Sequence, residues 1–349
     1  MKKIIQICPT FPPNIGGVGS YAKILGDSLR KKGIKSDYFV SQIQKKNLFT
    51  FKKKTFDLIN LLRGNDSSNI ILHFSGYGYA NRGLCFDLIN CLNEWKKTNS
   101  NNRLITIFHE IYAKGPLYRI SFWTHFFQKF IAKKLLNLSN ISIVTSKENK
   151  FELISLNSKK KILYTNVISN IGELNKNKNL KKRKKLAVIF GSSAQKESLY
   201  NDIILNEKKY LNIMKKMAIK KIIDIGPKIQ KIRALKFLEL KSVGIKPKKY
   251  ISTIMRKSKL GIVYYSVSQM TKSGIVAAYV SHGLLVLNRS REHNFKKCEF
   301  IPGNNFISDD AIKNVNFQKI ADKSFKNYHK YNIENLTKLI LKILKKKKN

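Results

Sequence analysis

The chain has 349 residues, of which 43% are hydrophobic, and a formal net charge of +47 with a pI of about 10.1. This length suggests two domains. The hydrophobic content is enough for a sizeable core, which excludes wholesale disorder. No apolar run approaches the roughly 20 residues that span a bilayer.

The basic excess allows three interpretations. It is mostly Lys rather than Arg, and Lys, Asn and Ile are all abundant, as a genome rich in A and T would produce without any binding role. A second interpretation is a charged face for anionic lipids or nucleotide substrates. The third is nucleic-acid binding, but such sites usually recruit Arg, and no helix-turn-helix, RNP or zinc-finger pattern occurs. A specific nucleic-acid partner is therefore not expected.

The start of the chain and the cysteines both favour a cytoplasmic protein. Met1–Pro9 resembles the start of a signal peptide, but its apolar stretch is short and meets a proline, so it predicts a buried first strand. The cysteines, Cys8, Cys85, Cys91 and Cys298, are scattered. Their spacing predicts neither a disulfide framework nor a metal site, and no cofactor is expected.

Apolar runs of strand length alternate with helical patterns in the first half. The predicted strands are Ile4–Ile7, Asp37–Val40, Ile70–Phe74, Leu104–Phe108 and Ile141–Thr145. The predicted helices are Tyr21–Gly33, Leu84–Trp95 and Leu117–Leu138. Continuous apolar strands between helices are typical of a buried parallel sheet, so this rhythm predicts an open, doubly wound α/β domain.

A second α/β series follows a basic, polar segment. Residues 171–185 are expected to form an interdomain linker, because they carry little apolar area to bury. The predicted strands after it are Leu186–Phe190, Lys221–Ile225, Leu260–Tyr264 and Leu284–Leu287, with a helix at Thr271–His282. The expected domains are residues 1–170 and 186–316, and residues 317–349 are expected to form a C-terminal helix.

Two candidate sites follow strands of the first half, where ligands bind in such sheets. Gly16 and Gly17 lie between the first strand and its helix, where glycines and helix N-terminal amides favour an anion; a simple tight turn is the alternative. His109 and Glu110 follow Leu104–Phe108 and are titratable groups suited to a hydroxyl substrate. A histidine satisfied by backbone carbonyls is the alternative there. For His73, which ends another strand, a packing role is favoured.

Two further candidates lie in the second half. The first comprises Gly191, Ser192, Ser193 and Lys196, which follow a strand and combine small residues, hydroxyls and an ammonium that suit a phosphate. A surface turn with a solvated Lys is the alternative. The second comprises Lys272, Ser273 and Gly274 at a helix start, where amides and the hydroxyl suit a diphosphate, with ordinary N-capping as the alternative.

The stretch Leu117–Leu138 is rich in aromatic side chains. Its apolar face comprises Ile120, Trp123, Phe127, Phe130, Ile131 and Leu135. The simpler interpretation is a helix docked on the sheet. The alternative is a helix that contacts anionic lipids through its aromatic and Lys side chains.

Together these segments resemble the GT-B glycosyltransferases, most closely the retaining type classed as family four. The resemblance covers nearly the whole chain and rests on four segments. They are the opening glycine loop, Pro12–Ala22; the histidine motif, Phe108–Glu110; the strand Val188–Ser192; and the donor-pocket segments Tyr250–Tyr265 and Ala277–Val286. The resemblance implies two Rossmann-like doubly wound domains facing a central cleft, with the final helix crossing back toward the first domain.

The resemblance also implies a function. The protein would move a sugar from a nucleotide-diphosphate sugar to an acceptor hydroxyl with retention of configuration. Independently of the resemblance, the sequence has no D-x-D triplet of the kind that chelates a divalent metal to a sugar nucleotide, which favours transfer without a metal. The acceptor would be a glycan, a lipid-linked sugar or a precursor of a cell-envelope polysaccharide. The protein would act in the cytoplasm or at the inner face of an anionic membrane. His109 and Glu110 would be catalytic, and the glycine, serine and lysine candidates would bind the donor.

One departure from the family pattern keeps an alternative open. The family usually carries two Glu residues eight apart, and counting back from Gly283 places them near Met270 and Ala278. Neither position holds a Glu. A catalytically inactive protein that binds a sugar nucleotide or a glycan is therefore the second hypothesis.

Overall fold

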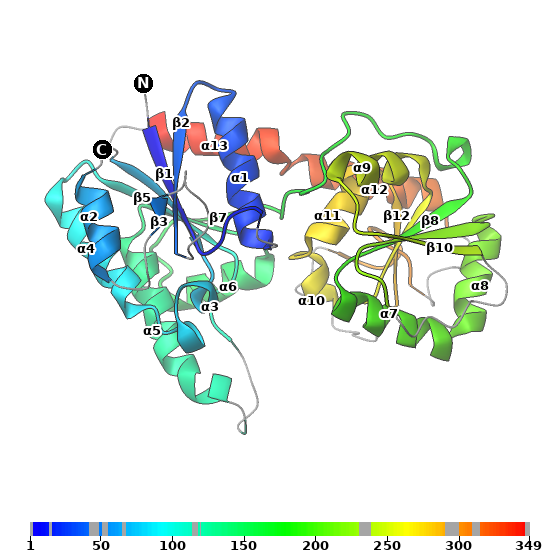
Figure 1. The fold of residues 1–349 in the computed structure, drawn as a ribbon, viewed down its shortest axis with the longest axis horizontal. Coiled ribbons are helices and arrows are strands. Elements are labelled where there is room, and N and C mark those ends of the chain that lie inside the picture. The colour runs from blue at the N-terminus through cyan, green and yellow to red at the C-terminus, as the bar shows by residue number, and fades with distance from the viewer. Residues whose placement is uncertain are drawn as a thin grey trace. The chain divides into compact units, whose positions relative to one another are not determined.

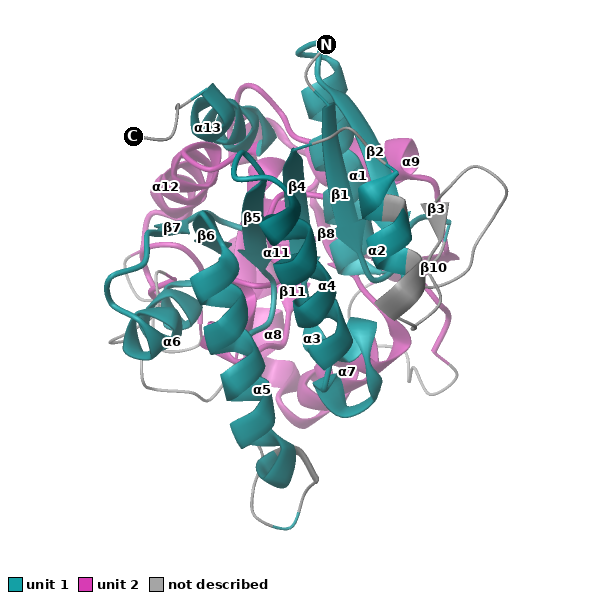
Figure 2. Cartoon of the chain, turned by 90° about the vertical axis from the view of Figure 1, so that its left-hand side faces the viewer, with its two compact units in different colours: residues 1–166, 333–349 teal, residues 167–332 magenta. Residues whose placement is uncertain are grey.

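The computed structural model describes residues 3–13, 16–41, 49–50, 55–64, 68–113, 118, 120–229, 239–289, 300–308 and 315–345. Asn14, Ile15, Leu117 and Cys298 lie outside these residues. The chain divides into two compact units, residues 1–166 with 333–349 and residues 167–332, coloured separately in Figure 2.

Unit 1 is built on a seven-stranded sheet in the order β3-β2-β1-β4-β5-β6-β7, and all its pairings are parallel. Its strands are β1 (Lys3–Cys8), β2 (Lys35–Val40), β3 (Phe49–Thr50), β4 (Asn69–Phe74), β5 (Arg103–Phe108), β6 (Ile141–Val144) and β7 (Ile162–Tyr164). Its helices are α1 (Gly17–Arg30), α2 (Thr55–Arg63), α3 (Gly76–Tyr79), α4 (Phe86–Thr98), α5 (Ile120–Leu138), α6 (Lys147–Leu156) and α13 (Ile333–Lys345). Figure 1 shows these elements along the chain.

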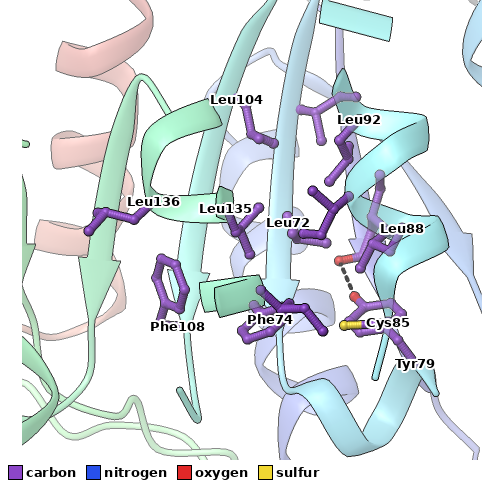
Figure 3. Close-up of a cluster of buried hydrophobic side chains, with 14 of the residues drawn as sticks. Leu72, Phe74, Tyr79, Cys85, Leu88, Leu92, Leu104, Phe108, Leu135 and Leu136 are labelled. Atoms are coloured by element: carbon purple, nitrogen blue, oxygen red, sulfur yellow. Dashed lines mark hydrogen bonds between the residues drawn. The ribbon is translucent and has the colours of Figure 1, made fainter. Parts of the chain in front are cut away.

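The core of unit 1 lies where helices cover the sheet. Leu72, Leu104 and Phe108 from the strands gather in one cluster with Leu92 of α4 and Leu135 of α5 (Figure 3). Strands covered in this way are apolar along their whole length, because both faces leave water. This is why the continuous apolar runs identified the strands.

The C-terminal part of the chain forms two helices rather than the single predicted one. The first, α12 (Phe317–His329), belongs to unit 2, and α13 belongs to unit 1. In unit 1, α13 packs against α1, where Thr337 Oγ1 donates to Ser28 Oγ at 2.8 Å. Arg103 at the start of β5 donates to the carbonyl of Leu344 at 3.2 Å. The last helix is thus fixed to the N-terminal sheet.

Unit 2 is built on a five-stranded parallel sheet in the order β10-β9-β8-β11-β12. Its strands are β8 (Leu186–Phe190), β9 (Lys221–Ile225), β10 (Glu239–Gly244), β11 (Leu260–Val263) and β12 (Leu285–Asn288). Its helices, besides α12, are α7 (Ser193–Leu205), α8 (Glu207–Lys216), α9 (Lys248–Lys257), α10 (Val267–Met270) and α11 (Gly274–Ser281). Strand order reverses beside β1 in unit 1 and beside β8 in unit 2, so both are doubly wound, as the sequence predicted.

The segment expected to be a linker packs as part of unit 2. Leu180 is buried in the core cluster of that unit. The guanidinium of Arg183 is buried as well and donates to the carbonyls of Ser258 at 3.0 Å and His282 at 2.9 Å. Burial lowers the pKa of Arg183 to about 10. Composition alone suggested a solvated segment, but Leu180 and the hydrogen-bonded Arg183 pack it onto the unit.

Candidate functional site

Three adjacent strands of unit 1 bring polar side chains to one edge of the sheet. The strands β1, β4 and β5 are neighbours, and the order of the sheet reverses between β1 and β4. Gln6 lies in β1, His73 lies near the carboxyl end of β4, and His109 directly follows β5. Doubly wound sheets bind their ligands at the carboxyl ends of strands beside such a reversal. His109, the catalytic candidate, therefore stands at the expected edge.

These three side chains form a hydrogen-bonded chain. Gln6 Oε1 lies 2.7 Å from His73 Nε2, and His73 Nδ1 lies 3.3 Å from His109 Nε2. An amide oxygen can only accept, so His73 carries its proton on Nε2 and its Nδ1 must accept. His109 Nε2 then donates to it, which leaves Nδ1 as the accepting nitrogen of the His109 ring. The chain fixes both tautomers and orients His109.

Burial keeps both imidazoles neutral. His73 is fully buried, and burial together with the neighbouring His109 holds its pKa well below the usual range. Burial lowers the pKa of His109 to about 4. At neutral pH, His109 therefore presents a neutral ring with a lone pair on Nδ1. Such a group can accept a hydrogen bond from a hydroxyl.

Tyr21 and Glu110 complete the surroundings of His109. The ring of Tyr21, from α1, stands edge-on to the rings of His109 and His73, with centroids 4.9 and 5.8 Å away. Tyr21 is buried, and its hydroxyl makes no hydrogen bond within the described part of the chain. Glu110 is exposed, and its carboxylate accepts from the Ser75 hydroxyl at 2.6 Å. An oriented carboxylate thus lies next in sequence to the neutral imidazole.

The Gly16–Gly17 pair opens α1, with extended backbone at the N-cap residue Gly16. A Cβ on Gly16 would lie 2.8 Å from Thr10 Oγ1, whereas a Cβ on Gly17 would meet no atom of the described residues within 4 Å. Gly19 is the position of close approach, where a Cβ would lie 2.3 Å from the carbonyl oxygen of Thr10. The fold therefore explains Gly19 by packing, and it leaves Gly17 open to a ligand.

In unit 2, the segment after β8 is a helix start. Ser192 is the N-cap of α7, and Gln195 Oε1 accepts from the Ser192 amide at 3.1 Å and from its hydroxyl at 3.0 Å. Gly191 precedes this cap, and Ser193 is the first helical residue. The Ser192 hydroxyl thus takes part in the ordinary capping of a helix.

Lys196 lies in the interior of unit 2. Its ammonium is 2.6 Å from Asp224 Oδ1 and donates to the carbonyl of Pro227, also at 2.6 Å. Both Lys196 and Asp224 are almost fully buried. Lys196, for which the sequence suggested a phosphate contact and, as the alternative, a solvated surface position, is half of a buried ion pair, so its charge is already compensated inside the fold.

The segment Lys272–Gly274 opens α11. The hydroxyl of Ser273 accepts from the amides of Ile275 at 3.2 Å and Val276 at 3.3 Å, which is N-capping. Lys272 is exposed, and a Cβ on Gly274 would meet no atom within 4 Å in the part of the chain that the structure describes. Lys272 and Gly274 therefore remain the accessible members of this candidate.

The two candidate segments of unit 2 lie together. A Cβ on Gly191 would be 3.3 Å from Ile275 Cδ1, in the first turn of α11. Gly226, which follows β9 and has a φ of +125°, lies so close that a Cβ would be 2.3 Å from the carbonyl oxygen of Gly191. The turns after β8 and β9 therefore pack against each other, and the start of α11 adjoins the first of them.

The two positions at which the family carries glutamates lie in the apolar core of unit 2. Met270 and Ala278 are fully or almost fully buried in one cluster of unit 2. Neither position therefore offers a polar group to a ligand. The segment before Gly283 packs as part of the fold instead.

Sequence reasoning assigned His73 to packing and did not single out Gln6. The structure confirms that His73 is buried, and it adds its hydrogen bonds to Gln6 and His109. One signal was present in the sequence, because two neighbouring predicted strands each carry a His near the carboxyl end. Pairing His73 with Ile107 in register is what brings the two rings within reach.

No metal cluster and no membrane span are found in the parts of the chain that can be described. No group of three or more His, Cys, Asp or Glu side chains there could hold a metal ion. No helix there is long and apolar enough to cross a membrane.

Comparison with known proteins identifies the fold. No family model matches the chain, and no curated protein matches it by sequence. Solved structures match it over its whole length. An alpha-glucosyltransferase in complex with UDP has a TM-score of 0.61 at 9% identity, covering 99% of this chain and 100% of that one. An E. coli structure described as trehalose-6-phosphate bound with UDP-2-fluoro glucose has a TM-score of 0.63 at 10% identity, covering 99% and 100%.

A glycosyltransferase from Rickettsia africae ESF-5 has a TM-score of 0.58 at 11% identity, covering 99% of each chain. These proteins are GT-B glycosyltransferases, and the chain has the GT-B fold. This confirms the predicted fold class of two Rossmann-like domains.

Proposed function

We propose that this protein is a glycosyltransferase that moves a sugar from a nucleotide-diphosphate sugar to an acceptor hydroxyl. The observation that carries the proposal is the position of the neutral, oriented His109 at the carboxyl edge of a GT-B N-terminal sheet. The UDP and UDP-glucose bound by the similar solved structures support a nucleotide sugar as the donor class.

The donor would bind to unit 2. The turn Gly191–Ser193 and the start of α11 adjoin, and the amides of Ser193 and Gly274, the first residues of the two helices, would face an anion. Lys272 would add positive charge, and the open space at Gly274 would let a diphosphate approach the backbone. Lys196 would act indirectly, by holding Asp224 beneath the turn. Amides and Lys272 would stabilise the leaving diphosphate without a metal.

Unit 1 would act on the sugar and the acceptor. His109 Nδ1 would accept from a sugar hydroxyl, and the Glu110 carboxylate would polarise or orient the same hydroxyl region. Gly17 would leave room for donor phosphates at the start of α1. Retention of the anomeric configuration follows only from the resemblance to family four.

The acceptor would be a glycan, a lipid-linked sugar or a precursor of a cell-envelope polysaccharide, and the reaction would occur in the cytoplasm. A lipid-linked acceptor would require the protein to reach a membrane surface.

The test begins with donor binding. Thermal stability is measured with UDP, GDP, ADP, TDP and CMP and with their sugar conjugates, in EDTA and at about 0.3 M salt, which screens nonspecific phosphate attraction. A ligand at about 100 times its Kd should stabilise the protein by roughly 2.7 kcal/mol. One nucleotide is expected to stand out. Equal shifts for all nucleotides, or none, would contradict a donor site.

Turnover with that donor then tests His109. We expect His109→Ala to lower kcat by 10²-fold or more while the protein stays folded. Phe151→Ser, at an exposed position on α6, is the control and should leave kcat unchanged. A folded His109→Ala protein with wild-type turnover would refute the role of His109.

The second candidate function is binding without turnover. The burial of Met270 and Ala278 where the family carries glutamates favours it. Donor binding with no product over a wide acceptor panel would support this candidate.

A further inference from the structure

Helix α5 has two apolar faces, and the fold uses only one. Ile131, Leu135 and Leu136 are buried against the core of unit 1, and Figure 3 shows Leu135 and Leu136 within that cluster. On the other side, the aromatic stripe consists of Trp123, Phe126, Phe127 and Phe130. Helix docking therefore does not account for these four aromatic side chains.

The aromatic stripe is exposed and continuous. Its members are 68%, 68%, 56% and 51% exposed in chain order. They follow the spacing i, i+3, i+4 and i+7, so they fall within an arc of about 100° on the helix. The buried face lies roughly 150° around the helix from them. In both views the N-terminal end of α5 extends away from the sheet of its unit (Figures 1 and 2).

Positive charge accompanies the stripe. Lys129, Lys133 and Lys134 are exposed, and the Lys134 ammonium lies 5.3 Å from the centroid of the Phe130 ring. The helix carries no acidic residue. Beside the stripe, a hollow of about 180 Å³ between α4 and α5 is lined by Phe86, Phe130 and Lys134, among others. The surface is thus apolar at its centre and basic at its border.

This combination points to one kind of partner. A second copy of the chain is disfavoured, because a symmetric contact would oppose two basic surfaces of a protein with charge +47. Phe side chains make no hydrogen bonds, so they suit acyl chains, while Trp and Lys suit the headgroup region. Lys side chains near an anionic leaflet are attracted to it.

We propose that the aromatic stripe and its three lysines form a docking surface for an anionic lipid bilayer, on which α5 lies in the interface. This proposal does not rest on the proposed transferase function, because the surface would bind lipid whether or not the protein turns over a sugar. The structure confirms the docked helix for the buried face of this stretch, and the proposal assigns lipid contact to its exposed face.

Trp123 provides a direct signal for the test. The chain has two tryptophans, and Trp95 is buried in the core, so a change in emission on vesicle binding reports Trp123. The full chain is titrated with vesicles of neutral lipid and with vesicles containing roughly a third anionic lipid, at about 0.1 M salt. We expect a blue shift, quenching by brominated acyl chains, and co-sedimentation with the anionic vesicles only.

Two variants separate apolar insertion from charge. Trp123→Ser/Phe127→Ser/Phe130→Ser should remain folded, because these residues are exposed, and should lower the partition coefficient at least tenfold. Lys129→Gln/Lys133→Gln/Lys134→Gln should lower it up to roughly 100-fold while keeping the aromatic side chains. The matched controls are Phe151→Ser for the first and Lys208→Gln/Lys215→Gln/Lys249→Gln for the second, all at exposed positions outside α5.

Three outcomes would overturn the proposal. The first is equal binding by the wild type and both α5 variants, which would make the attraction a property of the net charge. The second is equal loss in the control variants. The third is binding of single- or double-stranded nucleic acid that depends on the aromatic stripe while anionic vesicles are not bound, which would assign this surface to nucleic acid.

Discussion

His109 Nε2 lies 3.3 Å from Nδ1 of the buried His73. This contact determines which ring nitrogen of His109 carries the proton, and His109 is the partly exposed member of the pair. Gln6 accepts from His73 at the other end of the chain. Because each ring can hold its proton on one nitrogen only, the acceptor at Gln6 determines the nitrogen that faces a ligand at His109. Four predictions follow from this hydrogen-bonded chain and from the geometry of unit 2.

Replacing Gln6 with Leu should disturb the tautomers. The change leaves the Nε2–H of His73 buried without an acceptor, which costs about 1–3 kcal/mol. We expect NMR of the imidazole nitrogens to show a changed tautomer at His73 and His109. The control is Thr106→Val, which removes another buried hydrogen bond in unit 1, to Ser139, and should destabilise the protein without changing the tautomers. Unchanged imidazole signals in Gln6→Leu would contradict the chain.

Stability should fall with pH through the histidine range. The folded-state pKa of His109 is about 4 and that of His73 is lower than usual, whereas both are near 6.5 when unfolded. The unfolded chain therefore binds more protons between these values, so the free energy of unfolding decreases as pH falls from about 6.5 toward 4. Urea midpoints measure this. In His109→Gln, the free energy of unfolding should decrease less over this pH range than in the wild type. An identical decrease would count against the neutral state of His109.

Replacement of Lys196 should lower the stability of the fold more than it lowers the affinity for the donor nucleotide. Lys196→Met leaves the buried carboxylate of Asp224 unpaired and should destabilise the protein by about 3–5 kcal/mol. Lys196→Met/Asp224→Asn removes both charges and should recover more than half of that loss in chemical denaturation. If the double variant folds and still binds the donor nucleotide, Lys196 does not contact phosphate. If it folds with much weaker binding, the buried pair supports the donor site.

Gly274→Ala should lower nucleotide affinity without lowering the stability of the fold. Among the described residues, the added Cβ meets no atom within 4 Å, and Ala is favoured over Gly in a helix by about 1 kcal/mol, so stability should be unchanged or higher. If a diphosphate approaches this backbone, nucleotide affinity should fall by roughly tenfold, because the Cβ intrudes on the ligand. Calorimetric titration measures the affinity. Gly64→Ala, at the end of α2, serves as the control; equal affinities in the two variants would remove Gly274 from the donor site.

Hydrophobic patterning and glycine placement carried most of the fold prediction. Leu104–Phe108 and Leu260–Tyr264 were recognisable because strands covered on both faces lose their polar residues. Shorter or less apolar elements were missed, such as β7 (Ile162–Tyr164) and β10 (Glu239–Gly244), since their partly exposed residues leave no continuous apolar run. The break between α12 and α13 was missed because the helical pattern continues across Lys330–Asn332 without a proline or glycine.

The sequence by itself determined the two parallel α/β halves, the placement of His109 and Glu110 after a strand, and the two helix starts of the second half. These are local properties, set by periodicity and by the residues at strand ends. Only the tertiary structure decided that residues 6, 73 and 109 form one hydrogen-bonded chain, that Lys196 is paired with Asp224, and that α5 leaves its aromatic stripe exposed. Each of these depends on which strands pair and which helix face is covered, and contacts between residues so far apart along the chain exist only once the sheets have formed.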